Sequence, residues 1–298
     1  MLAICIPIYN QRIEPLLNAL EQQIAAINYP IEIVLIDDAS DAAIQQLNID
    51  SASKHRYIVL EQNIGRSRIR NLFLKHTSAD YLLFLDCDAL VQNESFLSNY
   101  ILSIQQKLQV VCGGRLNRTI PPSRANYLNW KYSVYRESSS FEKRKEQANQ
   151  SFMTNNFLIE RNTFESVHFD ERLTDYGHED TLFGFELHKR GITISHLDNP
   201  IFNGDIEDNA TYLRKTEMGL INLGMICKNL NNDPEFISSV RLLDYYFSIQ
   251  NTFTLQFIRK TYQLFYKLIL NRLKSGHGSL KLFDFYKLGY FDSIRGNK

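Results

Sequence analysis

The sequence has little of several residue types, and each shortage narrows the class of protein. Its 298 residues include four cysteines, and Lys plus Arg equal Asp plus Glu, so the formal net charge is zero. A balanced charge argues against nucleic acid or another polyanion as a partner. The cysteines lie far apart without metal-ligand spacing, three of them in or beside apolar segments, which predicts buried, reduced thiols of a cytoplasmic protein. They are Cys5, Cys87, Cys112 and Cys227.

Long apolar segments are also missing. No apolar run approaches the roughly 18 residues of a membrane-spanning helix. The apolar start is short, lacks a basic first part and soon meets Pro7, so we expect no signal peptide there. The hydrophobic fraction of 44% and the length are those of a globular protein with one large or two small domains.

What the chain does contain is an alternation of apolar and amphipathic segments through about residue 114. Apolar runs predict buried strands at 2–8, 31–36, 57–60, 81–85 and 109–114. Apolar residues at helical spacing predict helices at 12–27, 42–47, 66–76 and 93–107. This order is typical of βαβ units, so we expect an α/β fold with a mostly parallel sheet flanked by helices.

Two acids follow the most apolar of these strands directly. Asp86 and Asp88 end the run Tyr-Leu-Leu-Phe-Leu-Asp-Cys-Asp. Ligands of open α/β sheets bind outside the carboxyl ends of the strands, and two carboxylates there suit Mg²⁺ or Mn²⁺ beside substrate phosphates. A loop with two solvated acids is the simpler interpretation of such a short motif.

The same edge of the sheet receives polar residues from other strands. Tyr9 and Asn10 follow the first strand, and Asp37 and Asp38 follow the second. The segment 63–66 places backbone amides and Arg66 near the start of a helix, which is a site for phosphate. Each feature alone has a structural explanation, as a turn, an N-cap or a solvated basic face that includes Arg68 and Arg70. Together they favour a nucleotide-diphosphate site.

The second half of the chain offers a candidate base. A predicted strand at 152–159 carries Asn155 and Asn156 at a polar kink, and a helix begins near Glu179 and Asp180. Acids favour the first turn of a helix through its dipole, but one of these could also serve as a general base. The polar segment 115–150, which contains Trp130, is either a surface excursion or a flap that closes over substrate.

The predicted helix at 255–273 is amphipathic, and all its charges are basic. Such a helix can lie on an anionic membrane surface, or it can dock on the catalytic domain through its apolar stripe, which we favour. The stripe consists of Leu255, Ile258, Tyr262, Phe265, Leu268, Ile269 and Leu273.

Five short motifs follow one another along the chain. They are Pro7-Ile8-Tyr9-Asn10, Asp37-Asp38-Ala39-Ser40, Asn63-Ile64-Gly65-Arg66 with Arg70-Asn71, Asp86-Cys87-Asp88 and Gly177-His178-Glu179-Asp180. Their order and spacing resemble those of family 2 glycosyltransferases of the GT-A fold. The resemblance covers about residues 1–230. It implies a GT-A catalytic domain over 1–230, with a nucleotide-binding half at 1–114 and an acceptor half at 115–230. A helical C-terminal extension would follow at 231–298.

The resemblance also implies a reaction. A family member moves a sugar from a nucleotide-sugar to an acceptor hydroxyl with inversion, commonly with Mn²⁺ or Mg²⁺. We expect a UDP-sugar donor, a saccharide, lipid-linked or protein acceptor, and a role in cell-surface polysaccharide or glycoconjugate synthesis. We also expect a cytoplasmic protein, with peripheral contact to the cytoplasmic face of the membrane through 255–274 as one option.

The same resemblance assigns roles residue by residue. Asp180 looks like the base and Glu179 its neighbour for orientation or acceptor binding; Asp88 looks like the direct metal ligand, and Asp86 like the ribose-side or water-mediated acid. The implied nucleotide-sugar contacts are Pro7, Tyr9, Asn10, Asp37, Asp38, Asn63, Gly65, Arg66 and Asp86. Candidates for contacts with the acceptor are Trp130, because aromatic residues cluster around it in the polar segment 115–150, and also Asn155, Asn156 and His178.

One position departs from the family pattern. Many members carry a histidine shortly after the last strand, where this chain has Asn203 or, two residues on, Asp205. His196 is near but falls within a predicted closing strand at 192–197, and we expect it to be a packed core residue. Two alternatives stay open, a non-catalytic nucleotide-sugar-binding protein and a sugar nucleotidyltransferase. The second usually has a Gly- and Lys/Arg-rich loop after the first strand, which this chain lacks.

Overall fold

The computed structural model describes residues 1–117, 119–203 and 206–296. The chain forms two compact units. The sheet unit comprises Met1–Arg118, Ser138–Thr174 and Glu179–Asp205. The helical unit comprises Thr119–Glu137, Asp175–His178 and Ile206–Lys298. The sequence-based division at residue 230 thus differs from this one, which groups the long helix before that residue with the C-terminal helices.

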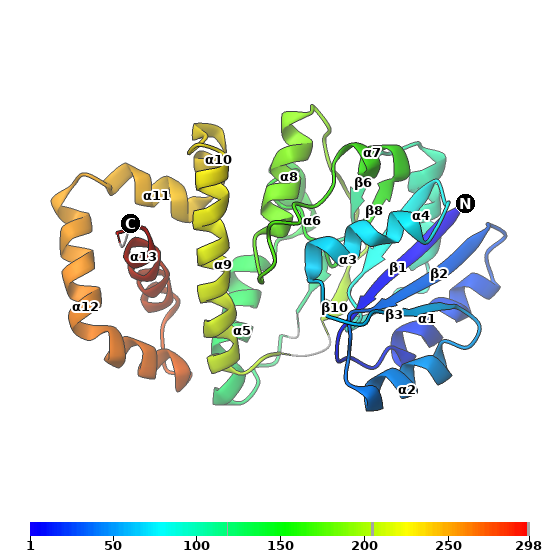
Figure 1. Ribbon diagram of the computed structural model, residues 1–298, viewed down its shortest axis with the longest axis horizontal. Helices are drawn as coiled ribbons and strands as arrows, with labels where there is room; N and C mark the ends of the chain where they lie inside the picture. The colour runs from blue at the N-terminus through cyan, green and yellow to red at the C-terminus, as the bar shows by residue number, and fades with distance from the viewer. Residues whose placement is uncertain (118, 204–205, 297–298) are drawn as a thin grey trace. The chain divides into compact units, whose positions relative to one another are not determined.

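The sheet unit is built on a seven-stranded sheet with the order β3-β2-β1-β4-β8-β6-β9 (Figure 1). β8 runs antiparallel to its two neighbours, and the other pairs are parallel. The mixed, mostly parallel sheet predicted from the sequence is therefore confirmed. The strands are β1 (Leu2–Ile8), β2 (Ile31–Asp37), β3 (Arg56–Val59), β4 (Tyr81–Leu85), β6 (Val110–Cys112), β8 (Asn156–Glu160) and β9 (Ser195–His196).

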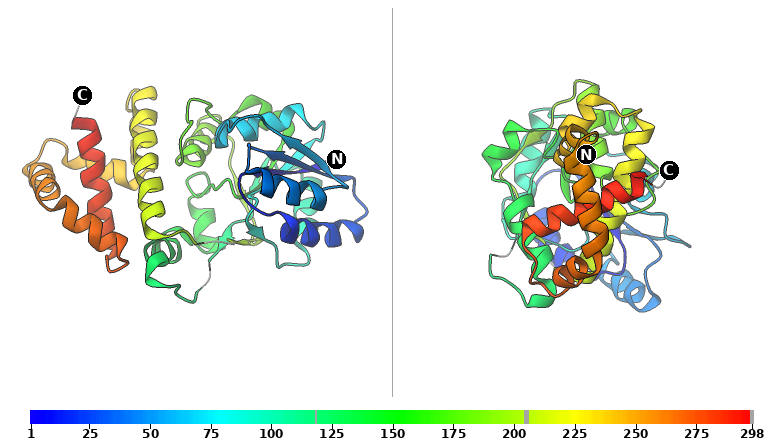
Figure 2. Two further views of the ribbon diagram at one scale, coloured as in Figure 1. Left: turned by 60° about the horizontal axis from the view of Figure 1, so that its bottom comes forward. Right: turned by 90° about the vertical axis from the view of Figure 1, so that its left-hand side faces the viewer.

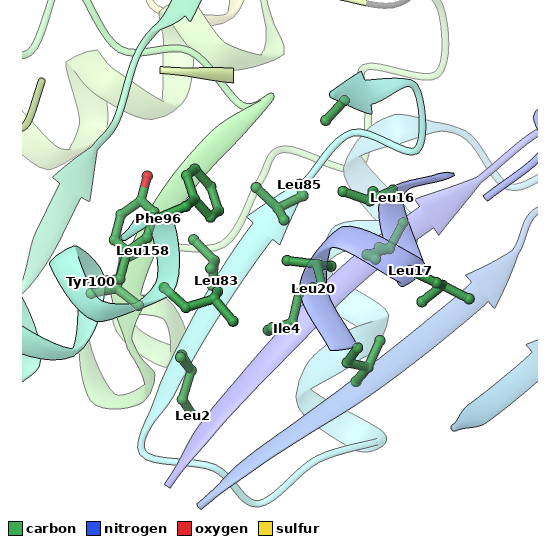
Figure 3. Packing of buried hydrophobic residues seen from close by; sticks show 14 of the residues in the cluster. Leu2, Ile4, Leu16, Leu17, Leu20, Leu83, Leu85, Phe96, Tyr100 and Leu158 are labelled. Atoms are coloured by element: carbon green, nitrogen blue, oxygen red, sulfur yellow. The ribbon is translucent and has the colours of Figure 1, made fainter. Parts of the chain in front are cut away.

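The central strands are buried on both faces, which explains their continuous apolar runs. Alternate residues of β1 and β4 fall into two separate hydrophobic clusters, because successive side chains of a strand point to opposite faces. On one face Ile4 and Leu83 pack with Leu16 and Leu20 of α1 (Glu14–Ala25) and with Tyr100 of α4 (Phe96–Gln105), as Figure 3 shows.

The opposite face of the sheet packs against a mainly aromatic layer. Phe84 of β4 stacks on Phe157 of β8, with ring centroids 4.9 Å apart. Phe169 and Phe183 stack in the same cluster at 4.2 Å. The helices on this face are α3 (Arg66–Leu72), α7 (Arg161–Ser166) and α8 (Glu179–Lys189). Both helices that carry charged site candidates, α3 and α8, are thereby fixed to one face of the sheet.

The remaining elements of the sheet unit are short. A small sheet has the order β5-β10-β7. Its strands are β5 (Ala89–Leu90), β7 (Arg115–Leu116) and β10 (Ile201–Asn203), and the other helices are α2 (Ala42–Ser51) and α6 (Phe141–Glu146). The predicted strand at 152–159 begins only at Asn156.

The helical unit contains six α-helices within its described residues. They are α5 (Tyr127–Tyr132), α9 (Asn209–Asn229), α10 (Pro234–Ser239), α11 (Arg241–Ile249), α12 (Phe253–Lys274) and α13 (Leu280–Gly296), arranged as Figure 2 shows. The predicted helix from Pro234 through Tyr246 is thus interrupted and forms α10 and α11.

The core of this unit lies mainly among α9, α12 and α13. Tyr262, Ile269 and Leu273 of α12 pack there with Phe283 and Tyr286 of α13. The predicted docking through an apolar stripe is therefore found against helices of this same unit. Among the described helices, none combines the length and the apolar character needed to cross a bilayer.

Candidate functional site

The loops that follow β1 and β2 are joined by hydrogen bonds. The N–H of Asp38 donates to the carbonyl of Ile8 at 2.8 Å. The N–H of Asn10 donates to Oγ of Ser40 at 2.8 Å, and Oδ1 of Asn10 accepts from the N–H of Asp41 at 2.7 Å. Both loops are thus held at one edge of the sheet, after the partly buried Pro7. Tyr9, 55% exposed, is the accessible aromatic side chain of this edge.

Asp37 holds the loop after β2 from inside. Its side chain is fully buried; Oδ1 accepts from the N–H of Ser40 at 2.7 Å and Oδ2 from the hydroxyl of Tyr57 at 2.5 Å. Burial and the nearby carboxylate raise the pKa of the Tyr57 hydroxyl, so that hydroxyl stays a donor. Both oxygens of Asp37 therefore have partners within the fold.

Asp38 orders the segment that leads into α3. Its Oδ1 accepts from the N–H of Ile64 at 2.7 Å and its Oδ2 from the N–H of Gly65 at 3.1 Å, while its carbonyl accepts from Nδ2 of Asn63 at 3.2 Å. Burial raises the pKa of this carboxyl above its usual value. The two amides that the sequence suggested as phosphate donors thus donate to Asp38.

Gly65 is required by the backbone at this point. Its φ is +85° and its ψ is 168°, a backbone conformation that residues with a Cβ rarely adopt. A Cβ here would also lie 3.1 Å from the carbonyl oxygen of Thr174. The glycine therefore fixes the start of α3 and with it the position of the arginines that follow.

Asp86 and Asp88 lie on the turn after β4, both half-buried. The N–H of Asp86 donates to the carbonyl of Asn155 at 3.1 Å, and its own carbonyl accepts from Ala89 at 3.0 Å. Burial, followed by the charge of Asp88, raises the pKa of the intervening Cys87 to about 12, so the thiol stays protonated. Two carboxylates with oxygen donors are thus presented at the carboxyl end of a buried strand.

Arg70 connects this turn to the start of α8. Its Nη2 lies 3.0 Å from Oδ1 of Asp86, and its Nη1 lies 3.8 Å from Oε1 of Glu179. Only 2% of the side chain is exposed, and its guanidinium carbon lies 5.8 Å from the ring centroid of Phe169. A buried cation therefore lies between two carboxylates that are 93 residues apart in the chain (179 minus 86).

Arg66 adds a second cation to Glu179, with Nη1 3.3 Å from Oε1. Burial alone would raise the pKa of Glu179, but the charges of Arg66 and Arg70 outweigh burial and hold it below its usual value. Glu179 is therefore an ionised carboxylate although it is only 4% exposed.

Asp180 behaves in the opposite way. Burial raises the pKa of its carboxyl to about 6, and the negative charge of Glu179 adds to the rise. Its Oδ1 accepts from the N–H of Thr181 at 2.7 Å and from that residue's hydroxyl at 3.3 Å. Two adjacent acids thus differ, one held charged by arginines and the other tuned toward neutrality, which is the pattern of a general base.

The two asparagines of the polar kink have different environments. Asn156 is fully buried; its Oδ1 accepts from the hydroxyl of Tyr100 at 2.6 Å, and its Nδ2 donates to the carbonyls of Gly114 and Asn199. These contacts use the whole amide within the fold. Asn155 is also buried, but its Oδ1 has no hydrogen-bond partner among the described residues.

Two acceptor candidates belong to the helical unit. Trp130 is 5% exposed and packs against Tyr127, with ring centroids 5.2 Å apart, so stacking on a saccharide would need this aromatic cluster to open. His178 has a positive φ of 66°. The backbone just before it is held by Asn222, whose Nδ2 donates to the carbonyls of Asp175 and Gly177 at 3.0 and 3.1 Å.

His196 is a buried core residue, as the sequence indicated. Its Nδ1 accepts from Nε of Arg144 at 3.4 Å and its Nε2 contacts the carbonyl of Ala148 at 2.9 Å. Burial lowers the pKa of His196, which favours the neutral ring. Two residues were considered in place of the late histidine of the family. Asp205 and the side chain of Asn203 both lie outside the part of the chain that the structure describes.

Arg70 is the residue whose position the sequence interpretation missed. A solvated basic face was the simplest expectation for the arginines of this helix, and it holds for Arg68, which is exposed. It is wrong for Arg70, which is buried. A signal was present, because Arg70 stands four residues after Arg66 and thus on the same side of the helix.

A comparison with protein-family models identifies this arrangement. The model of glycosyl transferase family 2 matches residues 3–170, more than half of the chain. The chain belongs to glycosyl transferase family 2. The matched part of this family 2 chain includes Asp38, Arg70, Asp86 and Asp88 and ends before Glu179 and Asp180.

One protein of similar sequence and two solved structures of similar fold were found. An uncharacterized glycosyltransferase of Haemophilus influenzae is 29% identical over 119 residues, which cover 38% of this chain and 46% of that protein. The mannosyltransferase PcManGT from Pyrobaculum calidifontis, solved with GDP-Man and Mn²⁺, has a TM-score of 0.56 at 14% identity, over 98% of this chain and 87% of its own. TarS of S. aureus has a TM-score of 0.50 at 17% identity, and the match covers 98% of this chain and 55% of the TarS chain. The GT-A fold expected from the sequence is therefore confirmed.

The donor set of the strand-end turn fits a hard divalent cation. Asp86 and Asp88 offer carboxylate oxygens, and Mg²⁺ is typically bound in proteins by one or two carboxylates together with substrate phosphates and water. Within the described residues, no three or more His, Cys, Asp or Glu side chains are grouped so that they could hold a metal ion.

Proposed function

We propose that this family 2 chain transfers a sugar from a nucleotide-sugar to an acceptor hydroxyl with inversion at the anomeric carbon. The arrangement that supports it most is the series Asp86–Arg70–Glu179, with Asp180 next to its last member. This series joins the candidate cation-binding turn to the candidate base through one buried guanidinium. A binding-only protein would not need a carboxyl group tuned in this way beside a charged neighbour.

Asp180 is the proposed base. With a pKa of about 6 it is mostly ionised at neutral pH and still basic enough to accept a proton. It takes the proton of the acceptor hydroxyl, whose oxygen forms the new bond to the anomeric carbon. The bond from that carbon to the diphosphate oxygen breaks, and its electron pair leaves with the nucleoside diphosphate. Glu179 keeps the pKa of Asp180 high through its charge.

Asp88 and Asp86 are proposed to hold Mn²⁺ or Mg²⁺. Such a cation, when bound, would neutralise charge on the diphosphate as the glycosidic bond breaks. Arg70 keeps Oδ1 of Asp86 in a fixed position. Tyr9 and Asn10, which follow β1, are proposed to contact the base and ribose of the donor. Asp37 already has both carboxylate oxygens hydrogen-bonded and is proposed to shape the loop after β2.

The donor is proposed to be a UDP-sugar. The acceptor would be a saccharide, a lipid-linked sugar or a protein, in cell-surface polysaccharide or glycoconjugate synthesis. GDP-sugars belong in the first test because the Pyrobaculum enzyme with the same fold was solved with GDP-Man.

The test is nucleotide release from UDP-, GDP- and dTDP-sugars, with Mn²⁺, with Mg²⁺ and after treatment with EDTA. Many glycosyltransferases hydrolyse their donor slowly, so no acceptor has to be known. We expect release from one donor class, at least about a hundredfold slower after chelation or in Asp88→Asn, since the cation carries much of the leaving-group stabilisation. Equal release with and without the cation would refute the metal assignment.

A second pair of variants tests the base. Asp180→Asn should lower kcat/KM for transfer by about a hundredfold or more and leave the Kd of the donor within about twofold, because a general base contributes to the chemical step. Glu186→Gln, on the same helix and paired with Arg190 near the surface, is the matched control and should change either value less than about twofold. Full activity of Asp180→Asn would remove this residue from the mechanism.

A further inference from the structure

α12 has two different apolar faces. One face packs into the core of the helical unit through Leu255, Ile258, Tyr262, Ile269 and Leu273. The other is exposed and consists of Phe253, Phe257, Leu264 and Leu268, with exposed fractions of 87, 70, 77 and 64%. We call these four residues the outer stripe. The sequence-based stripe mixed packed and exposed residues, since it included Phe265 and Leu268, which are 45 and 64% exposed.

The outer stripe is continuous along the helix. Phe253 and Phe257 are four residues apart, as are Leu264 and Leu268, and seven residues, or about two turns, separate Phe257 from Leu264. Four large apolar side chains therefore lie on one side of the helix. The right view of Figure 2 shows α12 (orange) in front of α13 (red), against which its other face packs.

A row of lysines borders this stripe. Lys260, Lys267 and Lys274 are spaced by seven residues and are all exposed, and none of them forms an ion pair with another described residue. α12 contains no Asp or Glu between Phe253 and Lys274. α12 has two further cations. Arg259 is paired with Asp292 of α13 at 2.7 Å and thus belongs to the packed side, and Arg272 is exposed near the end of the helix.

We propose that α12 binds the surface of an anionic lipid bilayer through the outer stripe and the lysine row. Exposed aromatic and aliphatic side chains enter the boundary between headgroups and acyl chains, and lysines beside them attract anionic headgroups. The helix lies in the plane of the interface, in agreement with the finding that no described helix is able to span a bilayer. This proposal does not depend on the proposed sugar transfer.

The charges make a second copy of this chain a poor alternative occupant. Two α12 helices in contact through their outer stripes would bring lysine rows together without a carboxylate on either helix. Like charges at short range repel each other. An anionic surface instead satisfies both parts of the pattern, the apolar stripe and the cations.

The test is sedimentation of the full chain with two kinds of sucrose-loaded vesicles. One kind consists of phosphatidylcholine alone, and the other contains in addition about 30% of the anionic lipid phosphatidylglycerol. We expect binding to the anionic vesicles and at least about tenfold weaker binding to the neutral ones. Added NaCl should weaken binding because it screens the lysines. No binding of the unaltered chain to anionic vesicles would overturn the proposal.

Two variants separate the contributions of charge and apolar contact. The triple variant Lys260→Gln, Lys267→Gln and Lys274→Gln should bind anionic vesicles roughly a hundredfold more weakly, at about fivefold for each lysine. Its control carries the same change at Lys75, Lys228 and Lys281, which are exposed elsewhere, so the net charge falls equally. Equal losses in the two triple variants would mean nonspecific attraction and would overturn the assignment to α12.

The apolar variant is Phe257→Ser with Leu264→Ser. It should lose at least tenfold in vesicle binding, whereas Ile49→Ser with Leu102→Ser, at exposed apolar residues of the sheet unit, should bind like the unaltered chain. Light scattering without vesicles tests the other occupant. A stable dimer that dissociates in the Phe257–Leu264 variant would show that the stripe is a contact between copies and would overturn the membrane proposal.

Discussion

Arg70 and Asp86 form an ion pair of 3.0 Å between α3 and the turn after β4, with the arginine almost fully buried. The same guanidinium lies 3.8 Å from Glu179. One side chain of α3 therefore sets the relative position of the strand-end acids and the start of α8. This contact has structural consequences that can be measured without knowledge of donor or acceptor.

Arg70→Met should lower the free energy of unfolding by about 3 kcal/mol, because removal of one partner leaves a buried carboxylate with less compensation. Urea denaturation with linear extrapolation measures the change. Arg68→Met on the exposed side of the same helix is the control and should stay within about 0.5 kcal/mol of the unaltered chain. Equal effects of the two substitutions would mean that the ion pair does not stabilise the fold.

The pH dependence of transfer should report the ionisation of Asp180. The pKa of this carboxyl is raised to about 6, so the fraction of ionised base, and with it kcat/KM, should fall as the pH drops below about 6. Above this value the base is ionised, and kcat/KM should level off. The measurement is a pH profile of kcat/KM with a donor found by nucleotide release.

Glu179→Gln supplies the matching change in this profile. Loss of the negative charge beside Asp180 should lower the pKa of Asp180 and move the acid limb to lower pH. The arginines that remain act in the same direction, since cations favour the ionised form. An acid limb that stays in place, or moves to higher pH, would contradict the assignment of this limb to Asp180.

Gly65→Ala should destabilise the chain more than Gly191→Ala. Both glycines have a positive φ, +85° and +72°, but a Cβ at position 65 would lie 3.1 Å from the carbonyl oxygen of Thr174, whereas position 191 has nothing within 4 Å. We expect losses of about 3 and about 1 kcal/mol in the free energy of unfolding. Thermal and urea unfolding of both variants check the order, and the reverse order would show that the contact with Thr174 does not matter.

Much of the sheet unit could be predicted because its signals are local. The run Tyr81–Leu85 has five apolar residues in sequence and forms a strand buried on both faces. Asp86 and Asp88 follow this run directly in the sequence, so their position at the end of the strand could be predicted with it. A strand buried on both faces needs no information from distant residues to be recognised.

The environment of individual polar residues could not be predicted in the same way. Asn155 and Asn156 are neighbours with the same side chain, yet only Asn156 has its amide oxygen and nitrogen hydrogen-bonded within the fold. Arg70 and Arg68 differ likewise, one buried and one exposed. These differences depend on which distant segments pack nearby, which periodicity does not contain.

α12 shows an intermediate case. Its helical structure and basic character could be predicted over 255–273, but the assignment of Phe265 and Leu268 to the packed face was wrong. A helix with apolar residues around most of its circumference has no single stripe from which to choose. The partners α9 and α13 decide which residues are buried.

Asp38 limits the sequence changes that the chain can accept at this position. Its two carboxylate oxygens each accept a backbone N–H, from Ile64 and Gly65. Asparagine has nearly the same size, but its NH₂ group would face one of these N–H groups, donor against donor. Glutamate keeps two acceptors but is one carbon longer. The direction of hydrogen bonding thus disfavours asparagine and the length of the side chain disfavours glutamate, so the two requirements together are met by aspartate.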